Sequence, residues 1–426
     1  MGQGESFDVI VIGAGPAGVS SAVFLAARGY RILLLDQARF PRDKVCGEFI
    51  SPAADRILDE LGILSAIESL SPVRLQGISI SAYENESFSV DYPAFPGTGQ
   101  SMSSLSVLRT VLDKLLLDRA REKGVRIMEG FKVTNFIFDQ GQVTGVEGWD
   151  EEKVSFRFNS RVVVDAGGRN AVSLRKLNLI KKDSGNGKIA LAAHWSGVNL
   201  PQNYCFMHIS PPGYTGISSV GKEMANVVLV VDRGLIKGVS DKKEFYAQAV
   251  LKNRSRAKLL KNGVVAQKVR AVDSLAYSVR PPECGGLVLV GDAMGFIDPF
   301  TGEGIYLSLR SSQIAAGVID DAFGNNDFSR NHLSVYERNR AKEFNKKFLL
   351  SRILQGFIYN RALCGWLVGT LSADPSLAET LVGVIGDYIP ADRVVTPGYL
   401  FKLLKKSFDW QVSQPSSSKK ASQTIP

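Results

Sequence analysis

The sequence predicts an α/β protein in which a mainly parallel sheet domain is interleaved with an antiparallel sheet domain and followed by C-terminal helices. Three observations support this prediction. The chain opens with a strand, a glycine-rich loop, a helix and a second strand, and another strand, loop and helix follow near residue 290. Segments 76–92, 188–232 and 267–278 are rich in β-branched residues. From Asn326 to Trp410 the apolar residues recur at helical spacing.

Composition excludes several classes of protein. The apolar fraction of 45% and charged fraction of 22% argue against a disordered, fibrous or polytopic membrane protein. The four cysteines form no Cys-x-x-Cys pair and there are three histidines, so we predict no metal and a reduced, cytoplasmic compartment. The net charge of +9 suits an anionic cofactor or lipid. No nucleic-acid partner is expected, because no helix-turn-helix or RNA-binding signature accompanies this charge.

The N-terminal unit has the pattern of a dinucleotide-binding fold. Residues 7–12 are an apolar run typical of a buried parallel strand, and residues 13–18 (GAGPAG) have G-x-G-x-x-G spacing. Gly13 permits the tight turn, Gly15 lets the backbone approach a pyrophosphate, and Gly18 lets the helix pack closely on the strand. The N-terminus of that helix then faces the phosphate charge.

An acidic residue follows the second strand, which is expected over residues 31–35. Asp36 lies eighteen residues after Gly18, where it can accept hydrogen bonds from ribose hydroxyls. An acid at this position disfavours the 2′-phosphate of NADP, so FAD or NAD is expected.

Two further segments favour a flavin. Residues 41–48 (PRDKVCGE) form a loop that contains Cys46, and residues 286–292 predict a buried strand that ends in Gly-Asp. Asp292 can accept a hydrogen bond from a ribityl hydroxyl. The turn with Gly302 and Gly304 would bring N–H groups of a helix start to the electron-rich edge of the flavin.

Together these segments resemble the flavoprotein family of the geranylgeranyl reductases and the aromatic hydroxylases related to p-hydroxybenzoate hydroxylase. The G-x-G-x-x-G loop is one signature. The Pro-Arg-x-Lys-x-Cys-Gly-Glu string at 41–48 is a second, typical of the geranylgeranyl-reductase branch. Gly-Asp-Ala followed by Pro-x-x-Gly-Glu-Gly-Ile, within 291–305, is the third.

The resemblance implies a Rossmann-like FAD-binding domain of the glutathione-reductase type, interleaved with a substrate domain. We assign residues 1–60, 100–175 and 278–325 to the FAD-binding domain and residues 61–99 and 176–277 to the substrate domain. Residues 326–411 form the predicted helical region, and the Ser- and Lys-rich residues near the C-terminus, 412–426, a disordered tail.

The resemblance also implies which residues hold FAD. Arg109 matches a family arginine near the FAD phosphates, at the start of a helix expected over residues 106–121. The complete set of expected FAD contacts is Gly13, Gly15, Ala17, Gly18, Asp36, Gln37, Arg42, Cys46, Gly47, Arg109, Asp292, Gly302, Gly304 and Ile305.

One turn departs from the family. The hydroxylases carry an Asp-Gly motif whose Asp serves both FAD and NADPH, whereas alignment on Gly168 places Gly167 at that position. Asp165 either substitutes for the missing Asp or caps the turn. The electron donor is therefore open between NAD(P)H and a redox partner such as a ferredoxin or free reduced flavin.

Cys46 is the predicted catalytic residue. The resemblance places the matching cysteine near the isoalloxazine, where a thiol can protonate a substrate carbon or tune access to the flavin. Arg39, Arg42 and Lys44 are close in sequence and would favour its thiolate. The alternative role of Cys46 is that of a small packing residue.

Other candidates have a weaker basis in the sequence. Tyr204, Tyr214 and Tyr277 are aromatic candidates for the substrate pocket, although no spacing distinguishes them from core residues. His194 and His208 lie in strand-like stretches and are expected to be structural.

The C-terminal region combines basic and apolar residues. Between Arg330 and Arg361 there are eight Lys/Arg and two Glu, and residues 401–408 (FKLLKKSF) form a short basic amphipathic segment. Two interpretations stay open, namely peripheral docking on anionic lipid at the inner membrane face, or a helical cap with a solvated basic face.

The leading functional prediction is reduction of C=C bonds in a prenyl or similarly apolar substrate, with hydride from reduced FAD and a proton from a nearby acid. The alternative is an FAD-dependent monooxygenase that hydroxylates an aromatic or quinone-like substrate, against which the Gly at position 167 counts. A flavin halogenase is disfavoured because the chain lacks the Trp-x-Trp-x-Ile-Pro motif.

Overall fold

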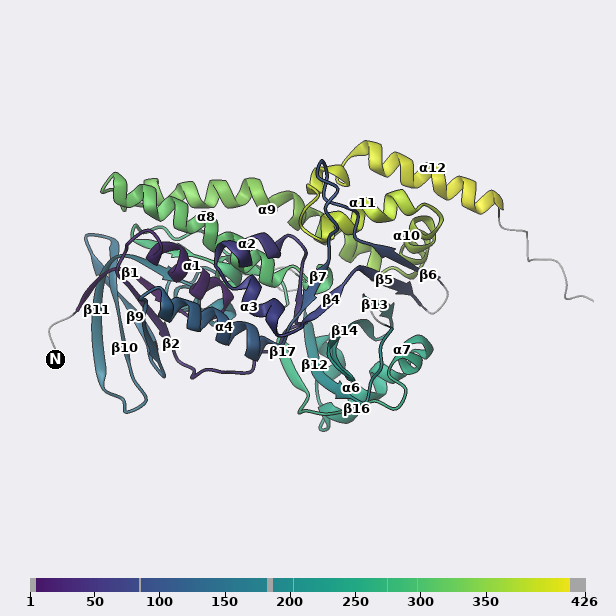
Figure 1. The fold of residues 1–426 in the computed structure, drawn as a ribbon, viewed down its shortest axis with the longest axis horizontal. Helices are drawn as coiled ribbons and strands as arrows, with labels where there is room; N and C mark the ends of the chain where they lie inside the picture. Colours follow the sequence, from purple (N-terminus) through teal and green to yellow (C-terminus); the bar gives the residue numbers. More distant parts are fainter. Residues whose placement is uncertain are drawn as a thin grey trace, which may run out of the picture.

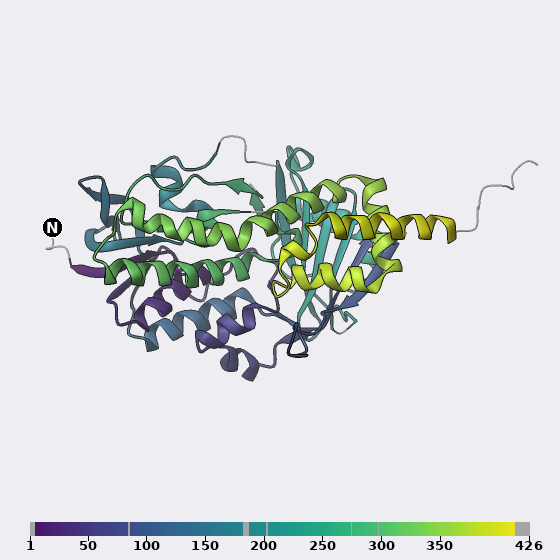
Figure 2. The same cartoon turned by 90° about the horizontal axis from the view of Figure 1, so that it is seen from above.

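A computed structural model describes residues 5–413, except residues 84–85, 182–186, 202, 274 and 297. Two sheets occupy opposite ends of an elongated molecule (Figure 1). Helices α8 (Gly304–Gly324) and α9 (Arg330–Ile358) contact each other and run along one side of the molecule (Figure 2). The predicted α/β architecture with two sheets and C-terminal helices is confirmed.

The first sheet has a parallel centre and an antiparallel edge. Its order is β8-β2-β1-β11-β10-β9, with β19 beside the end of β11. β8, β2, β1, β11 and β19 are parallel, whereas β9 and β10 are antiparallel to their neighbours. Its strands are β1 (Ser6–Ile12), β2 (Ile32–Asp36), β8 (Arg126–Glu129), β9 (Lys132–Asp139), β10 (Gln142–Trp149), β11 (Ser155–Asp165) and β19 (Leu287–Leu289).

Helices α1 (Pro16–Ala26), α4 (Arg109–Glu122) and α8 pack together beside this sheet. Because β1 and β2 are central strands, nearly all of their side chains are buried, which explains their continuous apolar sequence. The carboxyl ends of β1, β2, β11 and β19 therefore meet at one edge, where ligands bind in open α/β sheets.

The second sheet is antiparallel except for one strand pair. Its order is β16-β12-β15-β14-β13-β5-β6, and β17 also pairs with β12. Its strands are β5 (Gly77–Ala82), β6 (Glu86–Asp91), β12 (Lys188–Ser196), β13 (Tyr204–Ser210), β14 (Gly213–Gly221), β15 (Met224–Asp232), β16 (Val264–Val265) and β17 (Arg270–Asp273). Helices α6 (Lys242–Leu251) and α7 (Arg254–Leu259) lie against this sheet, with the buried Trp195 and Tyr246 between.

Three local predictions are corrected by the structure. β5 runs parallel to β13, because the two strands come from separate segments and no hairpin sets their direction. Residues 277–278 form β18 (Tyr277–Ser278), which pairs with β20 (Gly295–Phe296) instead of the second sheet. The helix expected over residues 106–121 begins at Arg109, because residues 104–106 form β7 and pair with β3 and β4.

Apart from the C-terminal helices, the remaining elements are short. They are β3 (Phe49–Ile50), α2 (Ala54–Glu60), α3 (Leu64–Ser69), β4 (Val73–Leu75), β7 (Ser104–Ser106), α5 (Val172–Lys176) and the 3-10 turns at Gly168–Asn170, Arg233–Ile236, Gly291–Met294, Pro299–Thr301 and Ala391–Arg393.

The C-terminal helices after α9 cover one edge of the second sheet. They are α10 (Arg361–Ala373), α11 (Pro375–Ile385) and α12 (Pro397–Ser413), and α10 and α11 contact β6. In the structure residues 412–413 belong to α12, because its helical pattern continues to Ser413, so the predicted tail does not begin at residue 412. Residues 414–426 lie outside the described residues.

Candidate functional site

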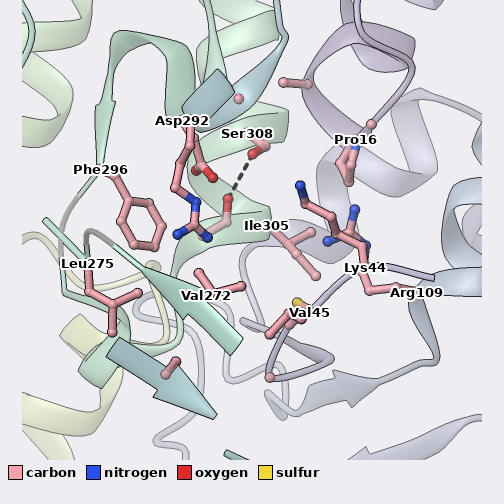
Figure 3. A pocket seen from close by; sticks show the side chains of 18 of the residues that line it. Pro16, Lys44, Val45, Arg109, Val272, Leu275, Asp292, Phe296, Ile305 and Ser308 are labelled. Atoms are coloured by element: carbon pink, nitrogen blue, oxygen red, sulfur yellow. Dashed lines mark hydrogen bonds between the residues drawn. The ribbon is translucent and has the colours of Figure 1, made fainter. Parts of the chain in front are cut away.

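A cavity of about 530 Å³ lies between the two sheets. One wall is formed by loops at the carboxyl ends of the first sheet and by helix N-termini, and the other by strands of the second sheet. Figure 3 looks into this cavity. Lys44 and Arg109 lie on one side, Phe296 and Leu275 on the other, and Asp292 reaches in between them.

The glycines of the first loop have different structural tasks. Gly13 has a φ of +96°, and a Cβ there would lie 2.6 Å from the backbone oxygen of Ala166. A Cβ on Gly18 would lie 1.7 Å from the oxygen of Gly13, so close packing of helix on strand requires glycine. Gly15 lines the cavity, and its Cβ would contact the Arg42 guanidinium alone, at 3.4 Å. Gly18 is therefore a packing residue, and Gly15 faces the ligand space.

Asp36 ties this loop to the end of β2. Its Oδ2 accepts a hydrogen bond of 2.7 Å from the Ala14 amide, and its Oδ1 accepts one of 2.8 Å from the Ala38 amide. Asp36 and Gln37 both line the cavity. The carboxylate retains further lone pairs toward the cavity, as the ribose interaction requires.

Cations gather at the middle of the cavity. Arg42, Lys44, Arg109 and Arg169 all line it. Burial lowers the pKa of Lys44, and the three neighbouring guanidinium groups lower it further. The pKa of Asp292 is raised by burial, although Arg169, Lys44 and Arg109 oppose this shift. The excess of positive charge matches the diphosphate of a dinucleotide, which is the largest anionic group such a ligand carries.

The start of α8 forms the opposite rim. Gly302 has a φ of +74°, and a Cβ there would lie 2.8 Å from the Phe49 ring. Gly304 is the first residue of α8 and lines the cavity with Ile305 and Ser308. The Ser308 hydroxyl donates to the Gly304 carbonyl at 2.9 Å (Figure 3). The unpaired N–H groups of this first turn suit an electron-rich ring edge.

A buried ion cluster supports this rim from α9. The Lys347 ammonium lies 3.7 Å from a carboxylate oxygen of Glu303 and pairs with Asp387. Burial raises the pKa of Glu303, and Lys347 opposes that shift. The cluster links the Gly302 turn to the C-terminal helices, a link for which the sequence offers no local signal.

Cys46 lies at the junction of the two walls. Its sulfur accepts a hydrogen bond of 3.3 Å from the Glu48 amide. Burial opposes the charge of Arg109, but Asp113 and the neighbouring Cys46 raise the pKa of this arginine above its usual range. Arg109 also forms a two-pronged pair with Asp113, with both distances 2.9 Å. The predicted Arg39 contributes no such charge, because its side chain binds Glu151 at the exposed surface.

Glu48 holds the Cys46 loop against the second sheet. Its carboxylate accepts from His194 Nε2 at 2.7 Å, from Asn226 Nδ2 at 3.1 Å and from the Arg109 amide at 3.0 Å. Asn226 also donates to the Cys46 carbonyl at 2.8 Å. The pKa of His194 is raised, chiefly by its hydrogen bond to Glu48, against the effect of burial. His194, which the sequence predicts to be structural, thus contacts the loop of the predicted cysteine through Glu48.

Sequence reasoning missed this network for a physical reason. Glu48 belongs to the Cys-Gly-Glu string, and its φ of 55° marks a special conformation. His194 and Asn226 lie on β12 and β15, far from the string in sequence. Their register pairs them directly across the sheet, which no local pattern reveals.

Asp165 caps the turn after β11. Its Oδ1 accepts from the Gly167 amide at 3.0 Å and its Oδ2 from the Ser173 amide at 2.8 Å. A Cβ on Gly167 would lie 2.9 Å from Ala171 Cα and 3.0 Å from Asp165 Oδ1. Of the two roles left open for Asp165, the structure favours the cap, and the geometry disfavours an aspartate at position 167.

The second wall of the cavity carries no charged side chain among the described residues. Its strand residues are Ile78 and Ile80 of β5, Ala190 of β12, Cys205, Phe206 and Met207 of β13, Tyr214, Gly216, Ile217 and Ser218 of β14, Val228 and Val230 of β15, and Val272 of β17. Burial raises the pKa of Cys205 to about 12, which keeps this thiol neutral. Such a wall favours an apolar ligand.

One of the three aromatic candidates faces this space. Tyr214 lines the cavity, and its hydroxyl donates to the buried carboxylate of Asp298. Tyr277 instead donates to the Asp292 carbonyl at 2.7 Å, and Tyr204 binds Asp91 near the surface. Burial and Arg256 lower the pKa of His208 to about 4, and its Nδ1 contacts the Ser81 hydroxyl at 2.5 Å.

The structure brings most of the predicted cofactor residues to one cavity, while Gly18 lies behind it. Those that line the cavity are Gly13, Gly15, Ala17, Asp36, Gln37, Arg42, Cys46, Gly47, Arg109, Asp292, Gly302, Gly304 and Ile305. Arg169 joins them without having been predicted. Within the described part of the chain, no group of three His, Cys, Asp or Glu side chains could hold a metal. No helix in that part is long and apolar enough to cross a membrane.

Comparisons with known proteins agree with this geometry. A chlorinase of 1H-pyrrole-2-carbonyl peptidyl-carrier protein from Pseudomonas fluorescens is 28% identical over 364 residues, covering 78% of this chain and 80% of the relative. A digeranylgeranylglycerophospholipid reductase of Methanococcoides burtonii is 26% identical over 361 residues, covering 82% and 83%. The solved myxobacterial chondrochloren halogenase superposes with a TM-score of 0.77 at 21% identity, covering 97% of this chain and 98% of the halogenase.

These relatives refine the functional expectation. The absence of the Trp-x-Trp-x-Ile-Pro motif argued against a halogenase, yet halogenases are among the proteins similar to this chain. Reductases are also among them. Residues 6–341 match the family model described as FAD binding domain. The chain therefore belongs to the FAD binding domain family, and it is an FAD-dependent flavoenzyme of the oxidoreductase and monooxygenase type.

Proposed function

We propose that the protein reduces a C=C bond of a prenyl or similarly apolar substrate. The observation that carries this proposal is the uncharged wall of the second sheet, which faces the same cavity as the predicted cofactor residues. An isoprenoid chain gains free energy from such a wall, because it is removed from water without leaving a polar group unpaired. The similarity to a digeranylgeranylglycerophospholipid reductase, and the Cys-Gly-Glu string, support the same substrate class.

The chain supplies the proton and the environment of the reaction. When bound and reduced, FAD supplies the hydride that adds to one alkene carbon. Cys46 Sγ–H gives a proton to the neighbouring carbon, so that the alkene gains one hydride and one proton. The sulfur left behind faces the Glu48 amide at 3.3 Å and the adjacent Arg109 guanidinium. Water then returns the proton to Cys46, and NAD(P)H or a redox partner such as a ferredoxin returns the electrons.

A second candidate is oxygen-dependent modification of an aromatic or quinone-like substrate. It is favoured by the Tyr214–Asp298 pair, because the Tyr214 hydroxyl on the second wall donates to a buried carboxylate. The Tyr214 oxygen can take a proton from a phenolic hydroxyl while its own proton moves to the buried Asp298 carboxylate, which leaves a phenolate and a neutral Asp298. The similarity to the chlorinase and the halogenase belongs to this second class of chemistry.

Flavin reoxidation in a sealed cuvette distinguishes the two candidates. The FAD-loaded protein is reduced chemically without oxygen and then given a polyprenyl lipid mixture, with saturated lipids of the same chain length as control. We expect the oxidised flavin spectrum to return with the unsaturated lipids alone, and mass spectrometry to find a product heavier by two hydrogens. Reoxidation only after air enters, with a hydroxylated or halogenated product from phenols and bromide, would overturn the reductase proposal.

Cys46→Ala tests the assigned proton donor. This variant should retain FAD, because the remaining cavity residues are unchanged, but anaerobic reoxidation should slow by at least about a hundredfold, the lower range of general acid catalysis. Cys46→Ser is the matched variant, since it keeps a protic group of similar size. Unchanged reoxidation in Cys46→Ala would leave Cys46 as a packing residue.

A further inference from the structure

We infer that helix α12 docks the protein on the surface of an anionic membrane. One side of this helix is committed to the protein. Tyr399 and Leu403 are buried in the core beneath the C-terminal helices, and the Tyr399 hydroxyl donates to the Leu377 carbonyl at 2.8 Å. Positions four residues apart lie on one helical face, so this pair defines the inward side of α12.

The outward side of α12 is also apolar. Leu400, Phe401 and Leu404 are 50%, 67% and 53% exposed, and their spacing of three and four residues places them on one face. A helix at the surface of a globular protein normally has a single apolar stripe and a polar outer face. A second apolar stripe on α12 indicates a second partner beyond the protein itself.

Exposed apolar side chains are concentrated around α12. Of the fifteen large hydrophobic residues that are exposed in the described chain, seven belong to α9, α10, α12 and the residue after α9. Besides those of α12, they are Leu349, Ile353, Tyr359 and Leu363. Scattered single residues of this kind need no explanation, but a group on one end of the molecule marks an interaction region.

The charge of this region identifies the partner. Lys402 and Lys405 are exposed beside the outward stripe, and residues 394–406 contain three lysines and no acid. Residues 326–426 hold 14 Lys/Arg and 8 Asp/Glu, so they carry +6 of the total +9. Lysines that flank an apolar stripe meet lipid phosphates while the stripe enters the acyl boundary.

Other occupants fit this surface less well. Lysine is depleted from the buried centres of protein interfaces, so a protein partner would have to desolvate or avoid these ammonium groups. A second copy of the chain, meeting through the same face, would bring its own lysines against them. In Figure 1, α12 is the outermost element above α10 and α11, so no other described element covers its outer side.

Docking through α12 would place the cavity close to the lipid. Ile385 at the C-terminal end of α11 lines the cavity, and Tyr399 of α12 is hydrogen-bonded to Leu377 near the N-terminal end of the same helix. The docking inference does not depend on the reaction, because a hydroxylase or halogenase of a lipid-soluble substrate would use the same surface.

Vesicle binding of the full-length, FAD-loaded protein tests this inference. Sedimentation with phosphatidylglycerol-containing vesicles should pellet the protein, and pure phosphatidylcholine vesicles should bind it at least about tenfold more weakly. The triple variant L400S/F401S/L404S should lose binding to the anionic vesicles by about tenfold or more, and K402E/K405E by a similar factor.

A matched control variant distinguishes docking through α12 from nonspecific binding of exposed apolar side chains to vesicles. The variant L70S/L235S/V264S removes three exposed apolar side chains elsewhere on the molecule and should bind like the parent protein. An unchanged FAD spectrum shows that each variant is folded. Equal pelleting of the parent and the α12 triple variant would overturn the inference. Light scattering that finds a dimer, converted to a monomer by L400S/F401S/L404S, would instead assign the face to a second copy.

Discussion

The two walls of the cavity are built on different principles. The wall from the first sheet consists of backbone turns, helix N-termini and charged side chains, and a Cβ added to Gly13 in this wall would lie 2.6 Å from a backbone oxygen. The wall from the second sheet consists of apolar side chains on regular strands, with Gly216 open enough to accept a Cβ at 3.8 Å from the nearest atom. At Gly13 the first wall can therefore change little, whereas at Gly216 the second wall can change its shape without loss of the fold.

Under the proposed function, this difference separates the wall that holds the cofactor from the wall that faces the substrate. Every FAD molecule presents the same groups to the protein. A rigid backbone that approaches these groups closely can therefore bind the cofactor without having to adapt. A substrate wall of interchangeable apolar residues can be adapted by volume alone. Two relatives of this chain are named as a chlorinase and as a phospholipid reductase.

The largest effect is expected where α1 packs behind the first wall, from Gly18→Ala compared with Gly15→Ala in the wall itself. The Cβ of Gly18→Ala would lie 1.7 Å from a backbone oxygen, so the free energy of unfolding should fall by more than the about 1–3 kcal/mol typical of overpacking. Gly15→Ala should leave the melting temperature of the FAD-free protein nearly unchanged but weaken FAD binding. Differential scanning fluorimetry and flavin fluorescence measure the two effects, and equal destabilisation by both variants would contradict the assigned division of tasks.

A smaller effect is expected from filling the second wall. Gly216→Val projects into the cavity from β14, and its Cβ makes ordinary contact with Met207. We expect FAD content and stability to stay within about 1 kcal/mol of the parent, while affinity for bulky apolar substrates falls by about tenfold or more. Gly213→Val is the contrasting control on the same strand, because its Cβ would lie 1.9 Å from the Val230 oxygen. Loss of FAD from Gly216→Val would mean that the two walls are not independent.

Tyr214→Phe sharpens the choice between the two candidate reactions. The substitution removes the hydroxyl that donates to Asp298 and leaves the ring against Phe300. Anaerobic reoxidation by an alkene should change by less than about threefold, whereas phenol hydroxylation would fall by about a hundredfold if this couple removes the phenolic proton. The measurement is the ratio of the anaerobic reoxidation rate to the phenol hydroxylation rate, compared between the parent protein and Tyr214→Phe.

The smallest effect is a pH dependence where the two walls meet. The pKa of His194 is raised above 6.5, chiefly by its hydrogen bond to Glu48. A raised folded-state pKa contributes stability that is fully present below 6.5 and is lost as the pH rises through the folded-state value. Urea unfolding should therefore show the parent more stable than His194→Gln by about 1 kcal/mol at low pH, with the difference shrinking at alkaline pH. A difference that grows with pH would contradict this sign.

Local patterns predicted the first wall well and the second wall poorly. The G-x-G-x-x-G loop, Asp36, Asp292 and the Gly302 turn were found from the sequence because each lies at a strand end or helix start that its neighbours define. Gly18 was included among the FAD contacts, but it packs behind the cavity. A glycine required by close packing and a glycine required by ligand contact look the same in the sequence.

Residues that act across long distances in sequence were missed. Arg169, Asn226 and the Glu303–Lys347–Asp387 cluster have no spacing that marks them, because each depends on the register or packing of separate elements. Of the tyrosines, Tyr214 alone among the three candidates lines the cavity, and alternation along β14 does not distinguish it from a core residue.

The sequence by itself determined the cofactor class and the α/β architecture, because phosphate binding and buried parallel strands impose short, local patterns on the chain. Only the tertiary structure decided which side chains surround Cys46, which tyrosine faces the cavity and which side of α12 is exposed. These depend on contacts between residues far apart in the chain. The free energy of these contacts comes from burial and pairing between separate elements, and such contacts produce no repeating pattern in a single sequence.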